Sequence, residues 1–138
     1  MYKKIIMSCL LLLSLICTFS SQAEGSSKKV SLTRQYLTLT PDITTNFYTT
    51  GKTIHFVRIK VELVVANQQH LRLIEHNQPL IRNAIIDVIG QKTSSEIKSY
   101  NGRKKVRKEC LDKVNEILLV ETGQTILSDL LFSKYIYQ

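Results

Sequence analysis

The chain has 138 residues, the length of one globular domain rather than two. It carries 19 lysines and arginines against 11 acidic residues, a formal charge of +8. Of its three cysteines, only Cys110 lies outside the apolar N-terminal segment, which excludes an intrachain disulfide in the remainder. The basic surplus favours an anionic partner: nucleic acid, a membrane surface or an acidic protein.

The first 23 residues predict an export signal. Lys3 and Lys4 precede an apolar run over 5–19, and Ser-Gln-Ala at 21–23 suits cleavage after Ala23. A permanent membrane anchor is the alternative, but a helix of this length extends about 22 Å against a hydrocarbon core of about 30 Å. Cleavage removes only the two lysines, so the formal charge falls from +8 to +6. Export argues against nucleic acid and leaves a membrane surface or a protein as partner.

The next part of the chain has β character. Residues 24–42 predict a polar linker and an N-terminal β segment, and a globular domain is predicted over 43–138. Within it, 43–48 is a threonine-rich candidate strand, followed by a turn in which Gly51 is free to take a positive φ. The clearest strand is 54–66, where apolar side chains alternate. Its predicted buried face consists of Val57, Ile59, Val61, Leu63 and Val65, and its opposite face carries Arg58, Lys60 and Glu62 toward solvent or a partner.

Helical patterns follow. A short one opens at 71–74, and Pro79 fits the first position of a new helix because that position needs no backbone N–H. Asn77 or Gln78 is then the predicted cap, and apolar residues recur at helical spacing until Gly90, which should end the helix. Residues 93–96 have capping-box spacing and predict a short turn containing Ile97.

A third helix is predicted over about 101–120, and the Thr-Gly pair at 122–123 breaks it. Its apolar stripe consists of Val106, Cys110, Val114, Ile117 and Leu118. The apolar and aromatic stretch 126–137 predicts a closing strand. The order strands, helices, strand predicts an α+β domain in which helices cover one face of a small sheet. A parallel pair joined by a right-handed crossover remains open, as does the strand order.

The residue types of catalytic and metal sites are scarce. His55, His70 and His76 have no cysteine pair beside them and do not share a helical repeat. Cys110 falls on an apolar stripe, where it should act as a small core residue. No glycine-rich phosphate loop, Gly-x-Ser-x-Gly or His-Glu-x-x-His is present. We therefore predict no enzyme, no metal, no cofactor and no small-molecule substrate.

A basic run crowds the first turns of the third predicted helix. It consists of Arg103, Lys104, Lys105, Arg107 and Lys108. Positive charge at a helix N-terminus opposes the macrodipole, although pairs from Lys105 to Glu109 and from Lys108 to Asp112 offset part of this cost. One interpretation is a solvated charged face. The other is an interaction surface for acidic protein or anionic lipid headgroups.

Four blocks in order resemble the periplasmic domain of the FliL family of flagellar basal-body-associated proteins, over about 44–138. The blocks are FVRIKVEL at 56–63, PLIRNAII at 79–86, GRKKVRKE followed by VNEIL within 102–118, and LFSKYIYQ at 131–138. They are similar to the family's central strand, proline-led helix, third helix and closing strand. Family members usually keep a longer, uncleaved transmembrane helix behind a cytoplasmic tail, whereas only four residues precede the apolar run here.

The resemblance implies a non-enzymatic accessory of the flagellar motor on the periplasmic side of the inner membrane. It implies stator and basal-body partners, a role in swimming motility, a stomatin-like fold and self-association into rings. It carries over no catalytic residue. The short N-terminal segment makes membrane attachment through partners an alternative to anchoring. A second hypothesis is a periplasmic binding module that presents its basic helix to an anionic envelope component.

Overall fold

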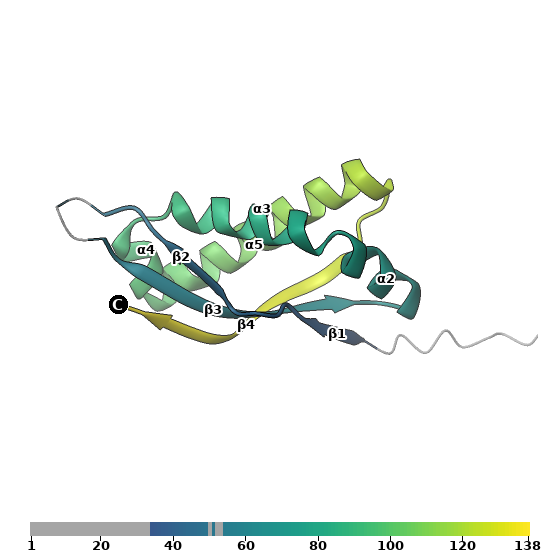
Figure 1. Ribbon diagram of the computed structural model, residues 1–138, viewed down its shortest axis with the longest axis horizontal. Coiled ribbons are helices and arrows are strands. Elements are labelled where there is room, and N and C mark those ends of the chain that lie inside the picture. Colours follow the sequence, from purple (N-terminus) through teal and green to yellow (C-terminus); the bar gives the residue numbers. More distant parts are fainter. Residues whose placement is uncertain (1–33, 50, 52–53) are drawn as a thin grey trace, which may run out of the picture. The chain divides into compact units, whose positions relative to one another are not determined.

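The computed structural model describes residues 34–49, 51 and 54–138 (Figure 1). The chain divides into two compact units, 1–30 and 31–138, and every described residue belongs to the second. The predicted export signal and most of the predicted linker lie outside the described residues. Within the described ranges, we find no helix with the length and apolar character that a membrane span needs.

Within the described residues, four antiparallel strands form the sheet. They are β1 (Gln35–Thr38), β2 (Ile43–Asn46), β3 (Phe56–Val65) and β4 (Leu127–Tyr137). The central strand is β3: β1 pairs with its C-terminal part, β2 with its N-terminal part, and β4 runs beside it over nearly its whole length (Figure 1). The parallel crossover that the sequence left open is therefore wrong.

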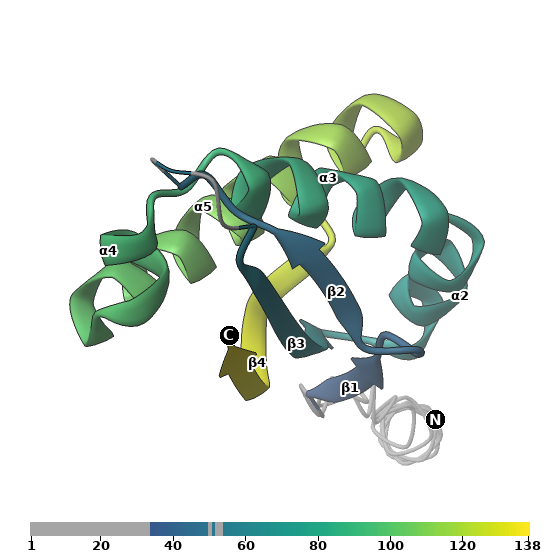
Figure 2. The ribbon, with the colours of Figure 1, turned by 60° about the vertical axis from the view of Figure 1, so that its left-hand side comes forward.

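The reason for the antiparallel pairing is the path of the helices. They are α2 (Gln68–His76), α3 (Gln78–Gly90), α4 (Ser94–Lys98) and α5 (Tyr100–Thr122). After α2, the chain crosses the sheet along α3 and returns along α5, so that β4 begins at the end where β3 stopped (Figure 1). Figure 2 shows α3 and α5 on the same face of the sheet. The predicted α+β order with a helical layer is confirmed.

The alternation predicted for the central strand is also confirmed. Val57, Ile59, Val61, Leu63 and Val65 are all 0% exposed. On the opposite face Arg58 is exposed and Lys60 and Glu62 are half-buried, whereas Val64 is buried. The burial pattern therefore agrees with the predicted strand register, since successive side chains point to opposite faces.

Capping groups set the helix boundaries. Asn67 begins α2 earlier than predicted, because its side-chain oxygen accepts from the His70 backbone N–H at 3.0 Å. Asn77 stands at the N-cap position of α3 without a side-chain cap hydrogen bond, and Pro79 occupies the second position of this helix rather than its first. Gly90 is the last residue of α3, as predicted, and the cap that follows it is Gln91 with φ −86°. Gly123 ends α5 in a left-handed conformation, with φ 72°.

The short helix α4 has the predicted capping box. The Thr93 hydroxyl accepts from the Glu96 backbone N–H, and the Glu96 carboxylate accepts from the Thr93 backbone N–H at 3.0 Å. This backbone hydrogen bond, together with one from the Thr93 hydroxyl, lowers the pKa of Glu96. Ser99 then caps α5, which begins at Tyr100. The two helices are thus fixed close together.

The core lies between α3, α5 and the inner face of the sheet. On α5, Val106, Cys110, Val114 and Leu118 are buried, while Ile117 is half-buried at the edge of the predicted stripe. Cys110 is 0% exposed, as expected of a core residue. Burial raises the pKa of its thiol to about 12.

The raised pKa predicts alkaline destabilisation. Below about pH 9 the Cys110 thiol is neutral in both the folded and the unfolded state, so its full contribution to the stability of the fold is present there. Between about pH 9 and 12 the unfolded thiol ionises while the folded one stays protonated, so stability falls as pH rises.

We expect iodoacetamide to label Cys110 in unfolded protein but not in native protein at pH 8, as read by peptide mass. Labelling of native protein at the unfolded rate would contradict this burial.

Candidate interaction groove between α5 and β4

The three histidines lie apart in the fold. The Nδ1 atom of His55 is 2.9 Å from the Gln138 backbone oxygen, and His70 packs beside the Asn67 cap at the start of α2. Over residues 34–49, 51 and 54–138, no three or more histidine, cysteine or acidic side chains converge in a way that could hold a metal ion. The basic run lies elsewhere, at a groove.

This groove lies where the first turns of α5 pass beside β4, and its volume is about 340 Å³. Its lining consists of Tyr100, Arg103, Lys104, Arg107, Leu131, Phe132 and Tyr135. Four of these residues share one face of α5, because residues three and four apart are neighbours on a helix. The other three come from β4. Basic and aromatic side chains therefore face each other across the groove.

A bulge in β4 produces the aromatic wall. Lys60 pairs with Lys134 but Val61 pairs with Phe132, so Ser133 is an extra residue opposite β3. Because of this extra residue, Phe132 and Tyr135 lie on the same face although they are three residues apart. Their ring centroids are 5.7 Å apart. Strict alternation would have separated these rings, so the aromatic wall could not be predicted from the sequence pattern alone.

The three groove cations differ in their partners. Arg107 donates to the Asp129 carboxylate and to the Leu130 backbone oxygen, the latter at 2.9 Å. The guanidinium carbon of Arg103 lies 5.5 Å from the Tyr135 ring centroid, and the Lys104 ammonium lies 4.5 Å from that of Tyr100. Within the described part of the chain, no carboxylate is at ion-pair distance from Arg103 or Lys104.

The other two members of the basic run face carboxylates outside the groove. The Lys105 ammonium is 3.9 Å from Glu96 and 3.9 Å from Glu109, and the Lys108 ammonium is 2.9 Å from Asp112. Both helical pairs expected from the sequence therefore form. These lysines are 67% and 74% exposed, so each pair contributes little stability. The basic run thus divides into a groove set and a paired set.

The side-chain hydroxyl of Tyr135 is a further feature of the groove. It is buried and, among the described residues, has no hydrogen-bond partner. Burial raises the pKa of the phenol to about 12, although the neighbouring Arg103 cation acts in the opposite direction. An unpaired buried hydroxyl costs about 1–3 kcal/mol. The groove therefore combines apolar surface, two cations without carboxylate partners and an unsatisfied hydroxyl, an arrangement suited to binding an anionic group beside an apolar one.

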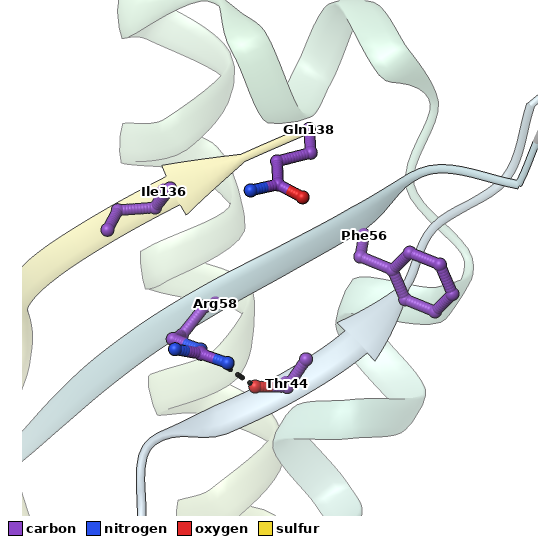
Figure 3. A pocket seen from close by; sticks show the side chains of 5 residues that line it. All are labelled: Thr44, Phe56, Arg58, Ile136 and Gln138. Carbon is purple, nitrogen blue, oxygen red and sulfur yellow. Dashed lines mark hydrogen bonds between the residues drawn. The ribbon is translucent and has the colours of Figure 1, made fainter.

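A smaller hollow of about 180 Å³ lies on the outer face of the sheet (Figure 3). It is lined by Thr44, Phe56, Arg58, Ile136 and Gln138. Arg58 donates through Nε to the Thr44 hydroxyl at 3.3 Å, and Phe56 and Ile136 flank it with about half of their surface exposed (Figure 3). With one cation that already has a partner, this hollow is a weaker anion site than the groove.

Comparison with known proteins places these features in a family context. The family model described as "Flagellar basal body-associated protein FliL" matches residues 36–138, which include all but the first residue of the sheet and every described helix. A curated relative, the flagellar protein FliL of Aquifex aeolicus (strain VF5), is 44% identical over 63 residues. That alignment covers 46% of this chain and 39% of the relative. The chain therefore aligns with well under half of the length of that relative.

Proposed function

This chain belongs to the FliL family of flagellar basal-body-associated proteins, and we propose that it is a non-enzymatic accessory of the flagellar motor that supports stator function and swimming. The observation that carries the proposal is the family match over residues 36–138. The groove between α5 and β4 supports a role in binding, because it gathers cations and aromatic side chains on an accessible surface. Basal-body and stator proteins are the partners we propose.

The proposed location is the periplasmic side of the inner membrane. Its support is the apolar run over 5–19 behind Lys3 and Lys4, which is typical of an export signal or a short anchor. We also propose that copies of the chain self-associate in a ring, as the family resemblance implies. Both proposals concern how the accessory is held near the motor.

A deletion strain tests the proposed function. We expect cells without the protein to assemble filaments but to expand more slowly in motility agar than their parent, because an accessory supports the motor without building it. Expression of the full chain should restore swimming. Equal swimming of the deletion strain and its parent would overturn the proposal, and loss of filaments would indicate an assembly role instead.

The second candidate is a periplasmic binding module that presents its basic helix to an anionic envelope component. Arg103 and Lys104 favour it, since neither has a carboxylate partner among the described residues. Such a module would leave swimming unchanged in the deletion strain. The same motility measurement therefore separates the two candidates.

Charge reversal in the groove should impair swimming without unfolding the domain. In the double variant Arg103→Glu with Lys104→Glu, two cation–π contacts of about 0.5–1 kcal/mol each are lost. Glutamates near the N-terminus of α5 recover about 0.3–1 kcal/mol each through the helix dipole. Thermal melts should therefore be close to wild type, while motility agar should show a clear defect.

A control variant makes the same charge change outside the groove. Lys108→Glu with Lys113→Glu removes two exposed pairs, with Asp112 and Glu116, and places like charges together. This control should melt at a lower temperature than the groove variant yet swim normally. If the two variants swim equally well, the groove cations are a solvated face and have no role in motility.

A further inference from the structure

The groove between α5 and β4 has walls of two different kinds, and together they specify an occupant. We propose that it docks an extended acidic peptide segment of a partner protein, in which a carboxylate side chain adjoins an apolar one. This inference rests on the proposed function as a binding accessory and adds the chemistry of the segment that is bound. It is argued from charge complementarity and from the apolar surface beside the charges.

The charge of the groove comes from Arg103 and Lys104. Arg107 is already occupied by Asp129 and by the Leu130 backbone oxygen, so it serves as a fixed part of the wall. Arg103 and Lys104 instead lie over aromatic rings, with no carboxylate of the described chain at ion-pair distance. A guanidinium presents a planar fork of donors that suits a carboxylate, and the adjacent ammonium adds a second charge. The free positive charge therefore calls for one or two carboxylates.

The apolar wall calls for a hydrophobic neighbour to those carboxylates. Phe132 is half-buried in the groove, and Tyr100 is 64% exposed at its edge. Aromatic and arginine side chains are the types enriched at protein interfaces. The volume of about 340 Å³ is at the lower end of the range for ligand pockets, which is about 300–1,000 Å³. It suits one or two side chains of an extended segment rather than a folded surface.

The distribution of charge along α5 favours a peptide over a lipid headgroup layer. Binding to an anionic membrane typically uses a cluster of about four to eight basic residues. Here Lys105 and Lys108 face carboxylates of Glu96, Glu109 and Asp112, so the unpaired positive charge does not extend along the helix. It is concentrated in a recess beside aromatic rings, a geometry that recognises a side chain.

Fluorescence anisotropy with the full chain in a neutral detergent tests this occupant. The probe is a short labelled peptide in which glutamates flank a central leucine and phenylalanine. We expect saturable binding that weakens at least tenfold when glutamines replace the glutamates or when glycines replace the apolar pair. It should weaken by a similar factor in Arg103→Glu with Lys104→Glu and by less than twofold in Lys108→Glu with Lys113→Glu.

Three outcomes would overturn the inference. They are absence of peptide binding, binding that the groove variant leaves unchanged, and binding that needs the glutamates but not the apolar pair. A soluble short-chain phosphatidylglycerol that binds at the groove where the peptide does not would identify the membrane as the partner instead. These outcomes are distinct from failure of the proposed function. If cells with the groove variant swim poorly but the wild-type protein does not bind the peptide, only the proposed peptide ligand is refuted. If the deletion strain swims normally, the proposed motor role is refuted.

Discussion

Replacing Val61 with aspartate should unfold the domain. Val61 is 0% exposed on the inner face of β3, opposite Phe132 and within the core beneath the helices. Loss of the valine removes about 1.5–3 kcal/mol of burial, and a carboxylate without a partner costs several kcal/mol more. Domains of this size are stable by about 5–15 kcal/mol, so this single change removes most of the margin. Far-UV circular dichroism melts measure the loss.

The neighbouring residue provides the control. Lys60 is half-buried on the opposite face and pairs with Lys134 across the strands. Lys60→Asp replaces a like-charge pair with an opposite-charge pair, which is favourable by about 0.2–1 kcal/mol and offsets the poor strand propensity of aspartate. We expect this variant to melt near wild type. If Lys60→Asp unfolds the chain and Val61→Asp does not, the register of β3 is shifted by one residue.

The central strand could be predicted from the sequence because burial of one face imposes a period of two. The same logic failed for β4, where the extra residue Ser133 places Phe132 and Tyr135 on one face. A bulge depends on how β4 aligns with β3, a strand about 70 residues earlier, and its own sequence does not encode that alignment. The aromatic half of the groove was therefore beyond the reach of local pattern.

The basic run shows a similar division. Helical spacing correctly predicted the contacts of Lys105 with Glu109 and of Lys108 with Asp112. Which cations stay without a carboxylate depends on tertiary neighbours: Asp129 reaches Arg107 from β4, and Glu96 approaches Lys105 from α4. Local sequence therefore indicated the segment, while the fold selected Arg103 and Lys104 within it.

Gly102→Ala should be destabilising, although alanine is usually the better helix former. Gly102 is buried in the first turn of α5, and its N–H donates to the Ser99 hydroxyl at 3.1 Å. A Cβ atom there would lie 2.6 Å from the Glu96 Cα and 2.7 Å from the Glu96 carbonyl carbon. These are backbone atoms of α4, which the capping box and the buried Ile97 hold in place. The clash cannot be relieved by rotating a side chain.

The sign of the effect follows from comparing two terms. Exchanging glycine for alanine inside a helix normally gains about 0.5–1 kcal/mol. Overpacking against a fixed backbone costs about 1–3 kcal/mol and occasionally more. We therefore expect a net loss of stability in urea unfolding, together with weaker peptide binding. We expect binding to fall because a displaced first turn of α5 changes the positions of the adjacent Arg103 and Lys104 relative to β4.

Gly90→Ala is the matched control. Gly90 ends α3 with ordinary helical geometry, and the nearest atom to an added Cβ would be the Asn46 backbone oxygen at 4.0 Å. With no clash, the propensity term acts alone, so this variant should gain up to about 1 kcal/mol. If Gly102→Ala instead unfolds at the same urea concentration as wild type or a higher one, α4 shifts to accommodate the added Cβ atom at little cost in stability. In that case the close approach of α4 to α5 does not position the basic side of the groove.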